Sequence, residues 1–142
     1  MGETKTICFA NNKGGSGKST TCANVGYGLS QLGQKILLLD GDMQLNLSLS
    51  YFPEEQVLEY AQGEKNLYYA VKNQKDLQDY IIPTPYENID IIPSSTLMSS
   101  IEYELFTKWQ RESILKRALE KVKESGIYDC ILIDSPPTLG GW

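Results

Sequence analysis

A glycine-rich segment between a strand pattern and a helix pattern constrains the fold of this 142-residue chain more than any other feature. Residues 13–20 read KGGSGKST. The apolar stretch Thr4–Ala10 before them predicts a short buried strand, and the stretch after them predicts a helix over 18–32 that ends at Gly33. Glycines let successive backbone N–H groups turn toward one anion, and a helix N-terminus adds partial positive charge. The segment therefore predicts a loop that binds phosphate groups.

The polar residues of this segment have chemical roles that follow from the motif. The backbone N–H groups expected to face phosphate oxygens belong to Gly14, Gly15, Ser16 and Gly17. Lys18 can reach the β- and γ-phosphates, the Ser19 hydroxyl can ligate Mg²⁺, and Thr20 can help to hold the α-phosphate.

Further strand patterns alternate with helix patterns along the chain. We expect three more buried strands, at Lys35–Leu39, Ile89–Ile92 and Tyr128–Ile133. Helices are expected at Asn66–Asn73 and at Leu97–Lys123, the second one ending at Gly126. This alternation predicts an α/β fold with a parallel sheet and right-handed crossovers.

The remaining stretches are polar or broken by proline. Gly41–Gln56 reads as a loop in which Leu47–Tyr51 could form one helical turn. Leu77–Ile82 reads as a connector that ends at Pro83.

Acidic residues stand where two of the expected strands end. Asp40 and Asp42 follow the second strand, and Asp134 follows the fourth. In parallel sheets the functional loops lie at the carboxyl ends of the strands. We therefore expect these acids to lie near the glycine-rich loop.

Composition excludes several kinds of chemistry. The chain has no histidine, which removes histidine general bases, Ser-His-Asp and Cys-His nucleophiles and histidine metal sites. Cys8, Cys22 and Cys130 are too widely spaced for a thiolate metal motif and are expected to be small buried residues rather than a disulfide framework. No apolar run approaches the length of a membrane-spanning helix.

The net charge of −5 argues against a uniformly basic surface, although a local basic patch is compatible with it. Basic residues between Lys108 and Lys123 could form such a patch for DNA. Glu112, Glu120 and Glu124 are interleaved with them, which favours a solvated helix face with ion pairs instead.

The glycine-rich segment departs from the ordinary GxxxxGK[ST] pattern, because Asn12 replaces the first glycine and Lys13 follows it. KGGxGK[ST] with this additional lysine resembles the deviant Walker A motif of the ParA/MinD ATPases. The resemblance implies a P-loop NTPase fold with a mostly parallel sheet flanked by helices. It also implies that Lys13 reaches the partner's nucleotide across a dimer interface, as a charge supplied in trans.

Three further segments resemble the same family. KILLLDGDMQLN, residues 35–46, is similar to the strand that commonly ends in DxDPQGN, with Met43 and Leu45 in place of the usual proline and glycine. ENIDIIPSS, residues 87–95, is similar to ENLDxIPSS, and YDCILIDSPP, residues 128–137, resembles the Walker B strand.

These segments imply roles for the three acids at the strand ends. By resemblance, Asp42 orients or activates the attacking water and Asp40 supports the Mg²⁺ shell. Asp134 is the Walker B acid, which holds Mg²⁺ through a water.

The resemblance is nearest to the short, Soj-like ParA proteins. It implies a cytoplasmic, nucleoid-associated MgATPase that drives plasmid or chromosome partitioning. It further implies a homodimer on ATP binding, a ParB-like partner, binding of non-specific DNA by the full-length protein, and no membrane partner. Two alternatives stay open, namely a MinD-like positioning ATPase and a non-catalytic nucleotide-dependent interaction module.

Residues 1–142 match the N-terminal part of a single ParA-like P-loop ATPase domain, since Walker B comes shortly before Trp142. In the family the phosphate-loop strand lies inside the sheet. Because the N-terminal part lacks the later strands of that sheet, we expect Thr4–Ala10 to lie near an open edge here, where it could pair with another chain. The expected consequence is dimerisation, strand exchange or poor solubility.

Overall fold

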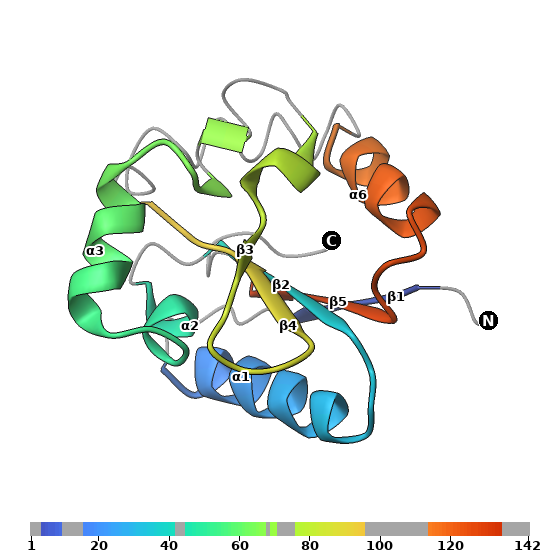
Figure 1. Ribbon diagram of the computed structural model, residues 1–142, viewed down its shortest axis with the longest axis horizontal. Helices are drawn as coiled ribbons and strands as arrows, with labels where there is room; N and C mark the ends of the chain where they lie inside the picture. The colour runs from blue at the N-terminus through green and yellow to red at the C-terminus, as the bar shows by residue number, and fades with distance from the viewer. Residues whose placement is uncertain are drawn as a thin grey trace.

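Within the described residues, five strands form one sheet in the order β1-β5-β2-β4-β3 in the computed structural model (Figure 1). The structure describes residues 4–9, 16–41, 45–67, 69–70, 76–95 and 114–134, with the backbone alone at 16–18 and 114–116. The strands are β1 (Lys5–Phe9), β2 (Ile36–Asp40), β3 (Ile82–Pro83), β4 (Ile89–Ile92) and β5 (Cys130–Asp134). All neighbouring pairs are parallel except β3 with β4.

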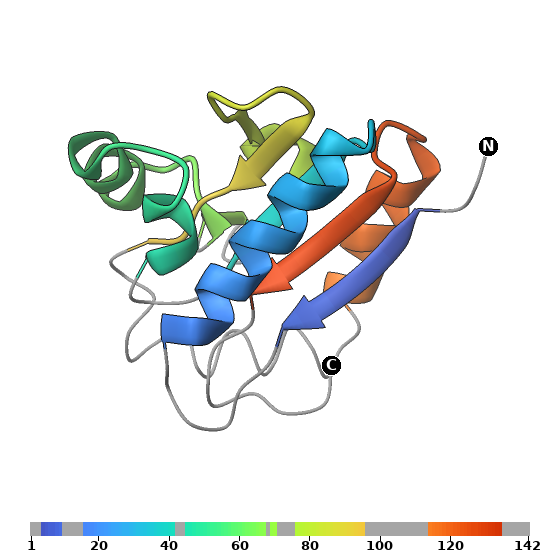
Figure 2. The ribbon, with the colours of Figure 1, turned by 90° about the horizontal axis from the view of Figure 1, so that it is seen from below.

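Helices cover both faces of this sheet. The helices with described bounds are α1 (Ser16–Gln31), α2 (Asn46–Leu49), α3 (Glu54–Gln62), the 3-10 helix η1 (Leu77–Tyr80) and α6 (Ile114–Glu124). Residues 67, 69 and 70 are also helical, within the helix expected at Asn66–Asn73. α1 and α6 lie on opposite sides of the sheet in both views (Figures 1 and 2). The result is the three-layer α/β arrangement expected from the sequence.

Successive residues of a strand point to opposite faces, and this alternation divides the core into two clusters. Ile36 and Leu38 pack on the side of α1, α2 and α3, together with Cys22 and Val57. Leu37 and Leu39 pack on the other side. The partners of Leu37 and Leu39 there include Leu77, Tyr80, Leu119, Val122 and Ile131.

Four strands and two helices of the described chain lie close to where the sequence places them. β1, β2, β4 and β5 each fall within about one or two residues of their expected bounds, which is the usual scatter of element ends. α1 begins at Ser16, and the expected helix end at Gly126 is confirmed by its left-handed φ of 70°. Residues 97–113 of the long expected helix lie outside the described residues.

Three expectations differ from the structure in part. Gly41–Gln56 contains the short helix α2 near the expected turn at Leu47–Tyr51, but it also contains the start of α3 at Glu54, which was not expected. Leu77–Ile82 is not an irregular connector, because it contains η1 and the first residue of β3, although β3 does end at Pro83. Cys8 is exposed, whereas Cys22 and Cys130 are buried as expected.

The charged face of α6 carries ion pairs. Lys121 Nζ lies 2.9 Å from Asp76 Oδ1, and Lys123 Nζ lies 3.8 Å from Glu120 Oε1. These pairs favour the solvated helix face over a DNA-facing patch for this part of the segment.

β1 lies at one edge of the sheet formed by the described residues, as the sequence predicts. It pairs with β5 alone among the described strands. Its Ile7 side chain is 40% exposed, although the strand is apolar. An exposed apolar edge strand is a template for pairing with another chain.

We expect the substitution Ile7→Lys to reduce self-association of this chain, because a lysine on an edge strand opposes pairing. Ile127→Lys is the matched control, since Ile127 is 51% exposed but lies outside the strands. Light scattering at high concentration should show a lower mean mass for Ile7→Lys than for Ile127→Lys. A monodisperse 15.9 kDa monomer for the unsubstituted chain would contradict the prediction.

Candidate nucleotide-binding site

The candidate site lies at the carboxyl edge of the parallel strands. The arrowheads of β1 and β5 point toward the end of the molecule where α1 begins (Figure 2). The register of the sheet places Phe9, Asp134 and Asp40 side by side, at the ends of β1, β5 and β2. The glycine-rich segment joins the end of β1 to the start of α1, so both elements that flank it reach this edge.

A buried hydrogen bond connects α1 to β5. The Ser19 hydroxyl donates to Asp134 Oδ2 at 2.6 Å, and both side chains are buried. A buried carboxylate needs such donors, because burial removes the water that would otherwise solvate its charge. This bond brings together two residues that lie 115 positions apart and that the sequence assigns to one metal site.

The donor set of this pair fits Mg²⁺. A serine hydroxyl and an aspartate carboxylate are both hard oxygen ligands, and Mg²⁺ in nucleotide sites takes few protein ligands besides phosphates and water. Thr20, the next residue of α1, is exposed. Ser19 and Asp134 are described residues that could hold the ion.

Asp40 makes a different contact from the one expected. Its Oδ2 accepts hydrogen bonds from the Ser48 backbone N–H at 2.9 Å and from the Ser48 hydroxyl at 2.6 Å. The first N–H groups of a helix have no acceptor within the helix, so Asp40 supplies one for α2. The described geometry gives Asp40 a role in holding α2, and its place in a Mg²⁺ shell stays a prediction.

The backbone beyond β2 is held to β5 as well. The Gly41 N–H donates to the Asp134 carbonyl at 2.8 Å, which continues the ladder past the last strand residues. The two acids therefore stand at the ends of strands that are fixed to one another.

Leu45 takes a backbone conformation that leucine rarely adopts. Its φ of 62° and ψ of 18° lie in the left-handed region, where glycine is favoured. The DxDPQGN pattern has glycine at this position, and glycine is the residue that this conformation favours. The buried Leu45 side chain packs with the α1-side core, which offsets the strain.

Several expected site residues lie outside the described residues. They are Lys13, Gly14, Gly15 and Asp42. Ser16, Gly17 and Lys18 are described by their backbone, which forms the first turn of α1. Their assigned functions stay predictions.

Sequence reasoning missed Ser48 and Tyr51, which hold α2 in place. The Tyr51 hydroxyl donates to the Ala23 carbonyl of α1 at 2.7 Å. A serine near the expected turn at Leu47–Tyr51 was a weak signal, since serine often takes part in hydrogen bonds at helix starts. Its partner across the connection could not be read from spacing alone.

Comparisons with known proteins agree with the fold. A mostly parallel sheet, flanked by helices and with this strand-to-helix segment, is the architecture of a P-loop NTPase. The sequence model of the AAA_31 family, described as an AAA domain, matches residues 4–142, and the chain belongs to this family.

Curated relatives match this chain over most of its length. The sporulation initiation inhibitor protein Soj of Bacillus subtilis (strain 168) is 40% identical over 136 residues, which cover 96% of this chain and 51% of Soj. The chromosome partitioning protein ParA of Caulobacter vibrioides (strain NA1000 / CB15N) is 33% identical, covering 95% of this chain and 49% of ParA. The chain is thus similar to the N-terminal part of Soj and ParA and spans about half the length of these curated relatives.

A solved structure shows the same fold. Cobyrinic acid a,c-diamide synthase from Mycobacterium smegmatis, with bound ATP analog and magnesium, is similar at a TM-score of 0.77 and 30% identity. The similarity covers 96% of this chain and 51% of that chain. Among the residues described here, no helix is long and apolar enough to cross a membrane.

We expect Ser19→Ala to lower the free energy of unfolding by about 1–3 kcal/mol, because the buried Asp134 carboxylate loses a donor. The measurement is urea unfolding without nucleotide or Mg²⁺. Ser50→Ala is the control, since its hydroxyl is exposed and bonds to the Asn46 carbonyl. It should change the free energy by less than about 0.5 kcal/mol. Equal effects of the two substitutions would contradict the importance of the Ser19–Asp134 bond.

Proposed function

We propose that this chain binds and hydrolyses MgATP as part of a ParA-type partition ATPase. The observation that carries the proposal is the buried hydrogen bond between Ser19 and Asp134. It joins the serine of the KGGSGKST segment to the acid at the end of β5, which is the pairing that a Mg²⁺-nucleotide site requires.

The residues of the segment would divide the binding of the nucleotide between them. The backbone of residues 14–17 and the Lys18 ammonium would hold the phosphates, and Thr20 would assist at the α-phosphate. Ser19 and Asp134 would hold Mg²⁺, directly and through water. When bound, Mg²⁺ neutralises charge on the phosphate oxygens and orients them.

Two residues would carry the hydrolytic step. Asp42 would orient the attacking water, since a carboxylate is the available base in a chain without histidine. Lys13 of one subunit would neutralise phosphate charge in the site of the other, which makes turnover depend on dimerisation.

The cellular role follows from the relatives. Soj and ParA are named for sporulation control and chromosome partitioning, so we propose that nucleotide-dependent dimerisation switches contact with DNA and with a ParB-like partner. This would place the protein on the nucleoid in the cytoplasm. Because ATP hydrolysis would serve to switch these contacts, turnover should be slow without the partner.

A second candidate is a nucleotide-dependent interaction module that does not hydrolyse ATP. The observation that favours it is the replacement of the usual proline and glycine by Met43 and Leu45 in the connection after β2. We rank hydrolysis first, because Leu45 has the left-handed backbone conformation that suits glycine at this position. Phosphate release separates the two candidates.

We expect Lys18→Ala to abolish ATP binding measured by isothermal titration calorimetry in the presence of Mg²⁺. The cause is loss of the charge that meets the β- and γ-phosphates. Lys35→Ala is a control, because Lys35 directly precedes β2 and so lies at the opposite end of the strand from the candidate site. Full affinity in Lys18→Ala would show that the nucleotide binds elsewhere.

We expect Lys13→Ala to retain ATP binding and to lose most of the phosphate release, since its charge acts in the partner subunit. Release should be measured with and without double-stranded DNA, alongside the unsubstituted chain. Absence of release from the unsubstituted chain would favour the non-catalytic module. Unchanged release in Lys13→Ala would remove the role in trans.

A further inference from the structure

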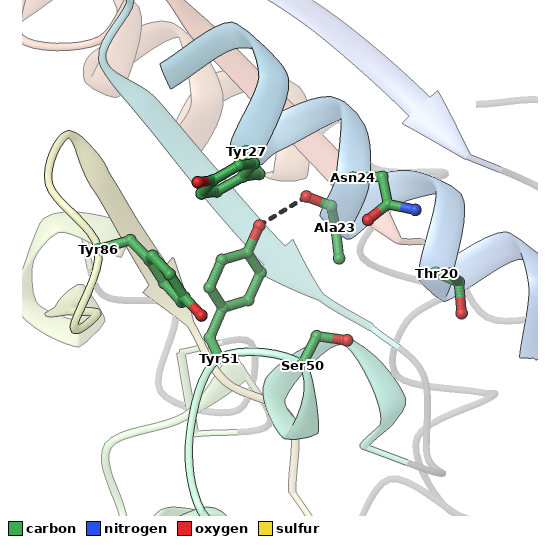
Figure 3. A pocket seen from close by; sticks show the side chains of 7 residues that line it. All are labelled: Thr20, Ala23, Asn24, Tyr27, Ser50, Tyr51 and Tyr86. Carbon is green, nitrogen blue, oxygen red and sulfur yellow. Dashed lines mark hydrogen bonds between the residues drawn. The ribbon is translucent and has the colours of Figure 1, made fainter. Parts of the chain in front are cut away.

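α2 is attached to the rest of the fold at two places. Within the helix, Ser48 donates two hydrogen bonds to the buried Asp40 carboxylate of β2. In the turn after its end, the Tyr51 hydroxyl donates to the Ala23 carbonyl of α1 (Figure 3). A helix of four residues has little stability of its own, so these attachments determine where it lies.

The fold around Tyr51 is built to keep its hydroxyl in this position. The Tyr51 side chain is 6% exposed. Its ring meets the Tyr86 ring edge-to-face at 5.5 Å, and Tyr86 meets Tyr27 in the same way at 5.7 Å. A Cβ atom at Gly26 would lie 3.3 Å from the Tyr51 hydroxyl. The glycine at this position therefore allows α1 to approach the Tyr51 side chain closely.

The hydroxyl of Tyr51 acts as a stable donor. Burial raises the pKa of Tyr51 above its ordinary value, with smaller contributions from Cys22 and Tyr86. The hydroxyl therefore stays protonated across the physiological range and keeps the bond to Ala23.

The contact reaches the same helix that would hold the nucleotide. Ala23 lies one turn of α1 beyond Ser19, and a cavity of about 160 Å³ between α1 and the turn after α2 is lined by Thr20, Ala23, Ser50 and Tyr51, among others (Figure 3). α2 is thus fixed to α1 on one side and to the end of β2 on the other.

We propose that Ser48 and Tyr51 are positioning residues for ATP hydrolysis, which hold α2 at a set distance from α1 and from Asp40. The inference rests on the proposed function. Ser48 acts through Asp40, and Tyr51 acts through α1. Asp42 lies in the sequence between Asp40 and Asn46, so the placement of α2 sets one end of the connection that carries it.

The expected effect is on turnover and not on affinity. Lys18 and Thr20, which are assigned to the phosphates, and Ser19, which is assigned to Mg²⁺, belong to α1, and no group assigned to phosphate binding belongs to α2. A displacement of about 1 Å in catalytic geometry can slow a reaction by roughly a hundredfold, whereas binding to an intact phosphate loop is little changed.

The test compares Tyr51→Phe with Tyr128→Phe in steady-state phosphate release by the full chain. Tyr128 is a matched control, since its hydroxyl donates to Asp90 Oδ2 at 2.6 Å on the opposite face of the sheet. We expect Tyr51→Phe to lower kcat by about tenfold with KM for ATP within about twofold. Tyr128→Phe should leave both unchanged. Equal kcat in the two variants would overturn the proposal.

Ser48 provides a second and independent variant. Ser48→Ala should lower kcat in the same way, and Ser48→Thr should restore it, because threonine keeps the hydroxyl that Asp40 accepts. Failure of the threonine to restore kcat would overturn the role of the hydroxyl. Urea unfolding of each variant shows whether a loss of kcat comes from unfolding of the protein.

Amide hydrogen exchange separates this inference from the proposed function. If the unsubstituted chain releases no phosphate, the kinetic role fails together with the proposed function. Exchange at the Ser50 and Phe52 amides then decides the attachment itself, since both bond to carbonyls of α2. Faster exchange in Tyr51→Phe than in Tyr128→Phe would support the attachment, and equal exchange would overturn it.

Discussion

Two buried carboxylates at the ends of neighbouring parallel strands determine the arrangement of the candidate site. Asp40 and Asp134 are register partners in β2 and β5, so their side chains leave the same face of the sheet. Like charges placed together and removed from water are unfavourable unless each has its own donors. α1 supplies the Ser19 hydroxyl to one acid, and α2 supplies Ser48 to the other. These bonds therefore help to place both helices on the sheet, together with the apolar core between them.

The elements that the sequence predicts well are those whose pattern is local. β2 and β5 are continuous apolar runs that end in an acid, and α1 begins in a glycine-rich segment and ends before Gly33. Each of these signals depends on adjacent residues alone. The acids at the strand ends could be predicted to lie together, because parallel strands share one carboxyl edge.

The elements that the sequence did not predict depend on tertiary partners. α3 follows Pro53 and has two acids in its first turn, but its nine residues form a stable helix only because Val57 and Ala61 pack on the α1-side core. β3 has two residues and exists through its pairing with β4. The bond from Ser48 to Asp40 closes a connection whose geometry depends on the left-handed Leu45. Such contacts have no signature in spacing.

Leu45 shows how a departure from a family pattern can leave a fold intact. A left-handed conformation is unfavourable for leucine by roughly 1–2 kcal/mol. Burial of a leucine side chain contributes about 1.5–3 kcal/mol, and Leu45 is buried among the apolar residues next to α1. The two terms are similar in size, so the substitution can be accommodated without moving the backbone. A glycine here would remove the strain and also the contact, which leaves α2 more dependent on Asp40 and Tyr51 for its position.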